Sequence, residues 1–203
     1  MLQPRAFSFY EQLRLSNGSC SDTAIDRKLL ELIPGALNVT TAHPVSDRNG
    51  TDRWIEHKRG THLSVDIKNR TKDYGKDDLA LEVWSVDRRI VGWTRDESKR
   101  TDFIFWWWQD THRYHLVPFV PLCAAMQQHW QEWYEEYDHR PQWTREHGGY
   151  LSECVFVPRN IVWREMYKFS TGFLDPFVDD QLPRPGPQPE HTGMFQHYGK
   201  RQA

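Results

Sequence analysis

The feature that most constrains the fold of this chain is the segment 102–108, which reads Asp-Phe-Ile-Phe-Trp-Trp-Trp. Its six consecutive apolar side chains would be costly to expose to water. The run is shorter than a buried helix, and it is rich in the aromatic residues that favour strands. It therefore predicts a buried strand.

Composition supports one domain with a substantial core. The chain has 203 residues, of which 38% are hydrophobic and 27% charged, and its formal net charge is -2. This charge excludes a strongly basic nucleic-acid coat but leaves local basic patches open. Ten tryptophans are well above ordinary usage. We expect most of them in the core and a minority stacked on bases or packed against a partner.

The chain shows no signs of export or membrane insertion. No run approaches the roughly 18 apolar residues of a membrane span. Residues 1–10 lack the basic start and apolar stretch of a signal peptide. The cysteines Cys20, Cys123 and Cys154 are odd in number and have no C-x-x-C spacing. We therefore expect a cytoplasmic protein without a disulfide framework.

The first half of the chain predicts a helix followed by three strands. Residues 22–33 have apolar side chains at helical spacing, and a Pro-Gly pair ends the pattern. Residues 36–41 favour a strand. The segments 51–56 and 62–68 alternate between apolar and polar side chains on either side of a turn at 58–61, which predicts an antiparallel hairpin.

The second half continues with further strands and two helices. An apolar stretch at 79–86 fits either a helix or a strand, and 114–120 is predicted to return beside 102–108. Residues 122–137 carry an apolar stripe at helical spacing. The remaining expectations, in chain order, are a loop at 138–149, a strand at 151–157 and a last helix at 158–169.

These elements together predict an α/β protein with a central mixed β-sheet flanked by α-helices. The domain is expected to span residues 21–179, after an N-terminal lead at 1–20. Residues 180–203 are rich in proline and poor in packing residues, and they are expected to form a disordered tail.

The predicted hairpin gathers groups that suit a metal ion and a phosphate. Alternation places Asp66 and Lys68 on one face of their strand, next to Asp52 on the neighbouring strand. Mg²⁺ prefers oxygen ligands and keeps several waters, so the two carboxylates and the carbonyl of Ile67 can hold it. Lys68 can orient or deprotonate a nucleophilic water and offset charge in the transition state.

The spacing of Asp52 and Asp66-Ile67-Lys68 resembles the PD-(D/E)XK nuclease superfamily, which has the restriction-endonuclease-like fold. Its pattern is an Asp on one strand, a turn, and an acid-x-Lys on the next strand. Its core has the order helix, three strands, helix, strand, and the resemblance covers about residues 21–108. Thr51 stands where the superfamily usually has Pro, and Asp66 stands where Glu is commoner.

The resemblance implies a Mg²⁺- or Mn²⁺-dependent deoxyribonuclease that hydrolyses phosphodiester bonds with a metal-activated water. Asp52 and Asp66 would hold the metal ion, and Lys68 would position or activate the water. The sequence looks similar to phage and bacterial members, which implies the cytoplasm of a bacterial cell, with a phage gene as one source. Many relatives cut both strands as dimers, so a homodimer is one expected assembly.

Other residues join the site by the same resemblance. Glu82 matches an extra acid found after the acid-x-Lys strand, as a metal ligand or a water-orienting base. The superfamily also carries an acid on the first helix, for which Asp22 and Asp26 are the alternatives. Lys99 and Arg70 are candidate DNA contacts, because they belong to a densely basic stretch around the acidic centre.

The residues of the motif also have ordinary structural interpretations, and two other functional classes stay open. Asp52 can cap a turn, and Asp66 with Lys68 can be an ordinary surface pair. In functional terms, the alternative is a catalytically silent nuclease-fold protein that binds nucleic acid or a protein partner. A structural or assembly protein of a phage or mobile element is the third class. The chain has no Gly-rich phosphate loop, no G-x-S-x-G elbow and no dinucleotide fingerprint.

Overall fold

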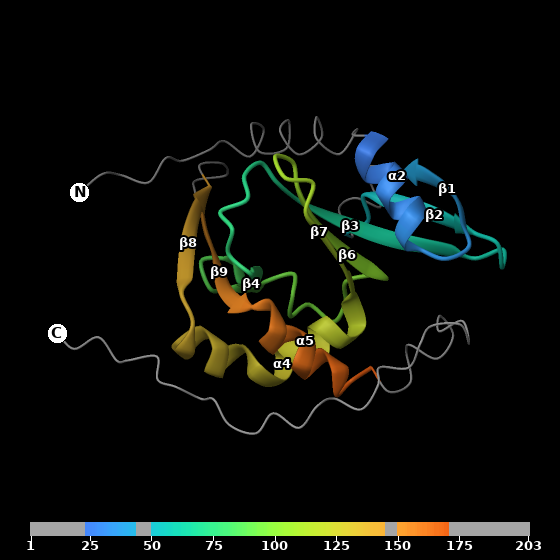
Figure 1. The fold of residues 1–203 in the computed structure, drawn as a ribbon. Coiled ribbons are helices and arrows are strands. Elements are labelled where there is room, and N and C mark those ends of the chain that lie inside the picture. The colour runs from blue at the N-terminus through green and yellow to red at the C-terminus, as the bar shows by residue number, and fades with distance from the viewer. Residues whose placement is uncertain (1–22, 44–49, 145–149, 171–203) are drawn as a thin grey trace, which may run out of the picture.

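The computed structural model describes residues 23–43, 50–144 and 150–170, which form two β-sheets and three α-helices. The helix α2 lies over the strands β1, β2 and β3, whereas α4 and α5 lie together along the other side of the molecule (Figure 1). The protein is therefore of the α/β class, as predicted.

The larger sheet has five strands in the order β1-β2-β3-β6-β7. Its first three strands are antiparallel, β3 and β6 are parallel, and β7 returns antiparallel to β6. The sheet is therefore mixed, which confirms that prediction. The strands are β1 (Ala36–Thr41), β2 (Arg53–His57), β3 (His62–Arg70), β6 (Phe103–Trp108) and β7 (Tyr114–Pro118).

A second, antiparallel sheet has four strands in the order β5-β4-β9-β8. The prediction of one central sheet was wrong in this respect. The alternation of a strand tells which face is buried but not which partner it joins, so it could not separate two sheets from one. The strands are β4 (Asp78–Val86), β5 (Ile90–Val91), β8 (His139–Thr144) and β9 (Tyr150–Pro158).

Each of the two hydrophobic clusters is closed by helices. The first cluster lies between α2 (Thr23–Leu32) and the mixed sheet, and Ile25 and Leu29 are its fully buried helical members. The second cluster joins both sheets to α4 (Phe119–Glu136) and α5 (Arg159–Tyr167). The helices at 22–33, 122–137 and 158–169 are thus confirmed with small changes of their ends.

The strand β6 contributes to both clusters, which confirms the prediction from its apolar run. Phe105 and Trp107 face α2, whereas Trp106 and Trp108 face the second cluster. The parallel register pairs Ile67 with Phe105, and Lys68 with Trp106. One face of the mixed sheet is therefore apolar under α2, and the opposite face carries charged residues of β3 beside indoles of β6.

The segment at 138–149 was predicted as a loop, and this was wrong for its described part. Residues 139–144 form β8 at the edge of the second sheet, paired with β9. Pro141 argues against a strand in the sequence, because proline is excluded from central strands. It is tolerated here because β8 is an edge strand. The short strand β5 was not predicted either. It follows a turn in which Asp87 and Arg88 have positive φ without a glycine.

The parallel pair β3 and β6 needs a crossover connection. The family resemblance implies a helix there. Residues 71–102, which the structure describes throughout, instead contain β4, β5 and turns and no helix. The order of one helix and three strands is confirmed, and the apolar stretch at 79–86, which fitted either type, is a strand.

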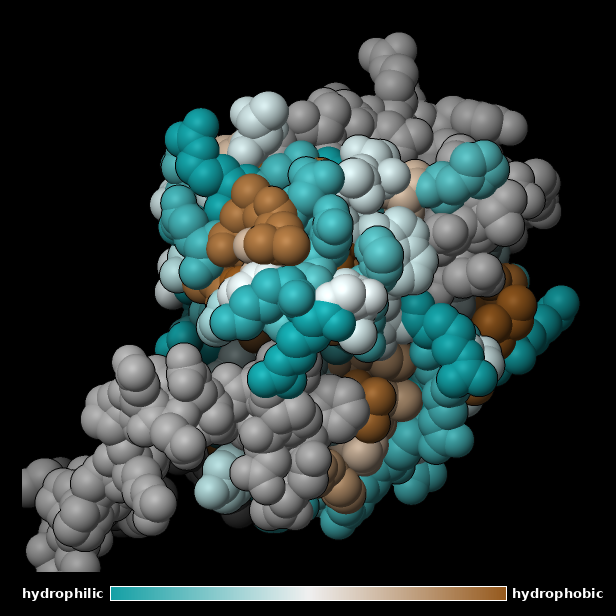
Figure 2. Space-filling model, turned by 90° about the vertical axis from the view of Figure 1, so that its right-hand side faces the viewer, coloured by the Kyte–Doolittle hydropathy of each residue, from teal (hydrophilic) through white to brown (hydrophobic). Residues whose placement is uncertain are grey.

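Several expectations lie outside the described residues, namely the lead at 1–20, the tail at 180–203 and the placement of Asp22. No helix in the described part of the chain is long and apolar enough to cross a membrane. Figure 2 shows the end of the molecule that carries α2, where most of the coloured surface is hydrophilic and hydrophobic side chains form separate patches. Leu30 and Leu37 are exposed members of these first elements.

The packing under α2 predicts a strong asymmetry between two adjacent leucines. Leu29 is fully buried and Leu30 is 39% exposed. We expect Leu29→Ala to lower the free energy of unfolding by about 2–5 kcal/mol, because it leaves a cavity against the sheet. The matched variant Leu30→Ala should cost about 1 kcal/mol or less. Urea denaturation of both variants measures this, and equal losses would contradict the placement of α2.

Candidate active site

A carboxylate held by two lysines lies at the centre of the charged face of the mixed sheet. Asp66, on β3, is almost completely buried. Its Oδ2 lies 2.8 Å from Nζ of Lys68 and 2.7 Å from Nζ of Lys99. The alternation of β3 brings Lys68 to the same face, as predicted. Lys99 arrives from the connection that precedes β6.

Asp52 joins this cluster from the residue before β2. Its Oδ2 accepts a 2.6 Å hydrogen bond from the backbone N–H of Ile67. Burial, together with the negative charge of Asp66, raises the pKa of Asp52 to about 7. The carboxyl groups of Asp52 and Asp66 are close enough for the charge of one to affect the pKa of the other. The carboxyl group of Asp52 is therefore expected to exchange its proton near neutral pH, whereas Asp66 stays ionised.

The electrostatics of Asp66 and Lys68 favour their charged forms. Burial tends to raise the pKa of Asp66, but the ammonium groups of Lys68 and Lys99 outweigh it and lower the pKa. Burial likewise opposes the charge of Lys68, yet the carboxylates of Asp66 and Asp52 raise its pKa above the ordinary value. Lys68 is therefore an ammonium at neutral pH, which suits charge stabilisation and hydrogen-bond donation better than proton abstraction.

Glu82 reaches the cluster from the second sheet. Burial raises its pKa, although the charges of Lys68 and Lys99 act in the opposite direction. Its Oε2 accepts a 3.1 Å hydrogen bond from the backbone N–H of Trp93. A Cβ added at Gly92 would lie only 2.1 Å from the carbonyl oxygen of Glu82, so this close approach requires glycine. Both sheets therefore build the site.

Two features of the site were missed in the sequence. The indole of Trp93 lies beneath both lysines, with Nζ of Lys68 at 4.5 Å and Nζ of Lys99 at 5.7 Å from its ring. Trp93 in turn contacts Trp106 with ring centroids 5.9 Å apart. Gly50, at φ 86°, leaves room for Lys99, because a Cβ there would lie 1.9 Å from the lysine Nζ. No local signal marked either contact.

The structure brings together Asp52, Asp66, Lys68 and Glu82, which are the four predicted catalytic residues, and it adds Lys99 as an ion-pair partner. It does not bring Asp26 to them. Asp26 Oδ1 is held at 2.7 Å by Nε of the buried Arg53, on the face of the mixed sheet that α2 covers. The side chain of Asp66 is on the opposite face.

The donor set partly fits a divalent cation. Among the described residues, no group of three His, Cys, Asp or Glu side chains is spaced to hold a metal ion. Mg²⁺, however, is commonly bound by one or two carboxylates with waters and substrate phosphate. Asp52 and Asp66 form such a pair, although Asp66 is already paired with Lys68 and Lys99. A cation there would take the place of the lysines on Asp66.

The fold and the cluster define an α/β protein with a buried carboxylate–lysine site between two sheets. Comparison with protein-family models, with curated proteins and with solved structures finds no match for this chain. The resemblance to the nuclease superfamily therefore rests on Asp52, Asp66 and Lys68 and on the hairpin that carries them.

The raised pKa of Asp52 predicts a pH-dependent stability. Between its ordinary value of 3.8 and about 7, the folded protein holds a proton that the unfolded chain has lost. The free energy of unfolding therefore decreases as pH rises through this window. The variant Asp52→Asn has no titrating carboxyl group at this position, so it lacks this contribution to the pH dependence of stability. We expect it to match the wild type near pH 4 and to exceed it by about 4 kcal/mol at pH 8, in urea denaturation without metal.

The control is Glu56→Gln, which changes an exposed carboxylate on β2. Its stability should follow the wild type at every pH. Asp66 contributes to stability with the opposite sign, since its pKa is lowered, and Glu56→Gln leaves this contribution as it is in the wild type. An Asp52→Asn profile parallel to that of the wild type would show that Asp52 is not a buried, protonated group.

Proposed function

We propose that this protein is a metal-dependent nuclease of the PD-(D/E)XK type, with a restriction-endonuclease-like core, that hydrolyses phosphodiester bonds in DNA. The observation that carries the proposal is the convergence of Asp52, Asp66 and Lys68 in one buried cluster. The order of α2, three antiparallel strands and a parallel fourth strand supports it. The crossover without a helix departs from the superfamily core.

In this proposal, Asp52 and Asp66 hold Mg²⁺ or Mn²⁺, and the carbonyl of Ile67 is a further ligand. The cation supplies Lewis acidity toward a phosphate and a water at neutral pH. Asp52 must lose its proton to serve as a ligand, which couples metal binding to pH near 7. Glu82, whose carboxylate is fixed by the N–H of Trp93, orients a water or completes the ligand set.

Lys68 and Lys99 would have a second role if a cation were bound at Asp66 and offset its charge. Their ammonium groups are then free to face a phosphate and to stabilise the charge that develops during bond cleavage. Trp93 lies beneath both ammonium groups and limits where they can move. Positively charged groups fixed in this way need no reorganisation during the reaction.

The alternative function is a catalytically silent protein that binds nucleic acid through the same face. One observation favours it, because Asp66 already has two ammonium partners. A buried ion-pair cluster is nevertheless an expensive way to stabilise a fold, and hydrophobic replacements are often equally stable. The two functions differ in metal binding, which only the nuclease requires.

Cleavage tests the proposal directly. The full-length protein is incubated with supercoiled plasmid, linear duplex and single-stranded DNA in the presence of Mg²⁺ or Mn²⁺. We expect Lys68→Ala and Asp66→Asn to reduce the rate by at least about 10²-fold, because each removes a group that contacts the reacting centre. Lys58→Ala, in the exposed β2–β3 turn, is the control and should keep the wild-type rate.

Circular dichroism establishes that each variant is folded. Wild-type cleavage that survives in folded Lys68→Ala would contradict the assigned site. Absence of cleavage on all three substrates, together with absence of metal binding, would favour the silent binding protein.

Metal binding gives an independent prediction. Mn²⁺ should raise the melting temperature of the wild type, since it binds the folded chain only. Because Asp52 must release one proton, we expect the apparent affinity to fall about tenfold for each pH unit below 7. Titration calorimetry at pH 6 and pH 8 measures this. Asp66→Asn should abolish the Mn²⁺ effect, whereas Glu56→Gln should retain it; an effect that persists in Asp66→Asn would place the metal elsewhere.

A further inference from the structure

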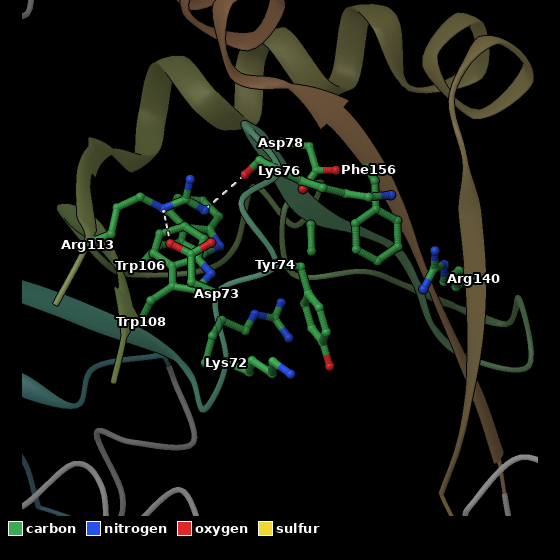
Figure 3. A pocket seen from close by; sticks show the side chains of 12 residues that line it. Lys72, Asp73, Tyr74, Lys76, Asp78, Trp106, Trp108, Arg113, Arg140 and Phe156 are labelled. Carbon is green, nitrogen blue, oxygen red and sulfur yellow. Dashed lines mark hydrogen bonds and ion pairs between the residues drawn. The ribbon is translucent and has the colours of Figure 1, made fainter. Parts of the chain in front are cut away.

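A cavity of about 340 Å³ lies between the two sheets, next to the candidate active site. Its floor contains the buried indoles of Trp106 and Trp108. The indole N–H of Trp106 has no hydrogen-bond acceptor among the described residues. Tyr74 and Phe156 lie at the other side of the cavity in the view of Figure 3.

The cavity lies beside the candidate active site, because the same faces of β3 and β4 contribute residues to both. On β3, Asp66 and Lys68 belong to the site, and the next residue on that face, Arg70, lines the cavity. On β4, Glu82 belongs to the site, and Ala80 on the same face lines the cavity. One step of two residues along a strand is about 6.6 Å, which is close to the spacing of successive phosphates in an extended strand of nucleic acid.

The rim of the cavity is basic. Arg70, Lys72, Lys76 and Arg140 are exposed cations that line it. Within the described residues none of these four side chains has an ion-pair partner within 4 Å. A fifth cation, Arg113, is held by Asp73 at 2.9 Å. The other acid of the lining is Asp78, so that the lining holds five cations and two carboxylates. The rim is therefore suited to an anion.

Aromatic rings accompany these cations. Tyr74 is 78% exposed, and Nζ of Lys72 lies 5.4 Å from its ring centroid. The guanidinium of Arg140 lies 5.3 Å from the ring of Phe156. Figure 3 shows Tyr74 between Lys72 and Phe156 in this view, with Arg140 beyond them. Cations interleaved with accessible aromatic rings are typical of surfaces that bind the backbone and the bases of single-stranded nucleic acid.

We propose that this cavity binds one unpaired nucleotide of a single DNA strand, with its base against Tyr74 and Phe156 and its phosphate against Arg70 and Lys72. The proposal rests on the proposed function, since it places the bound strand across the active site. The cavity proposal also specifies the substrate of the proposed nuclease. A base in a duplex is stacked on both faces and cannot enter a cavity of this size without being extruded. The substrate is then a single strand or an unpaired end.

Binding is measured without catalysis, so that the two proposals are separable. The probes are a fluorescein-labelled dT₁₂ and a blunt 12-base-pair duplex hairpin, titrated with the full-length protein in EDTA by fluorescence anisotropy. We expect dT₁₂ to bind at least about tenfold more tightly than the hairpin. Tyr74→Ala should weaken dT₁₂ binding about tenfold, which corresponds to the loss of one stacked base.

Salt dependence supplies a second readout that a merely structural role would not change. We expect Arg70→Ala to reduce the slope of log affinity against log salt by about 0.7, the value for one phosphate contact on a single strand. The matched controls are Tyr167→Ala and Lys58→Ala, an exposed ring and an exposed ammonium that do not line the cavity. Both should bind dT₁₂ as the wild type does.

The outcomes distinguish the cavity from the catalytic site. Equal affinity for dT₁₂ and hairpin, or a dT₁₂ preference unchanged in Tyr74→Ala and Arg70→Ala, overturns the cavity proposal, and cleavage that depends on Lys68 would still support the nuclease. A preference for dT₁₂ that Tyr74→Ala removes supports the cavity. The same preference without cleavage of any substrate supports the cavity and overturns the nuclease.

Discussion

The buried negative charge of Asp66 is the constraint on which the rest of the site depends. A carboxylate removed from water must be compensated, and here two ammonium groups from different segments converge on one oxygen. Lys68 arrives by the alternation of β3, whereas Lys99 must be delivered by the long crossover to β6. Gly50 leaves the space that Lys99 occupies. The crossover, and with it the second sheet, is thereby tied to the charged face of the mixed sheet.

The two faces of the mixed sheet differ in character: one is an apolar layer under α2, and the other carries the charged cluster. Under α2, Ile67 and Phe105 build an apolar layer, and Asp26 serves Arg53 rather than the acidic cluster. On the opposite face, charged residues of β3 stand beside the indoles of β6, and Trp93 links the lysines to Trp106. Because Trp93 packs against the core residue Trp106, it limits the positions that the two lysine side chains can take.

Much of the site was predictable because it depends on short-range periodicity. Alternation along β3 predicts that Asp66 and Lys68 share a face, and the hairpin places Asp52 beside them. The first helix, the first three strands and the buried strand β6 follow from the same kind of pattern. Asp26 was weighed as a site residue because helical spacing alone does not reveal which partner a carboxylate finds. Its pairing with Arg53 depends on the packing of α2 against the sheet.

The sequence by itself thus determined the apolar strand at the centre of the fold, the hairpin and the carboxylate–lysine set, because period-2 patterns specify faces. Only the tertiary structure decided that there are two sheets, that β8 joins the edge of the second, that Lys99 pairs with Asp66, and that Trp93 lies beneath both lysines. It also decided that a basic, aromatic cavity lies next to the candidate active site. These features depend on which distant strands pair, and pairing is set by the long-range burial of side chains, which no local pattern records.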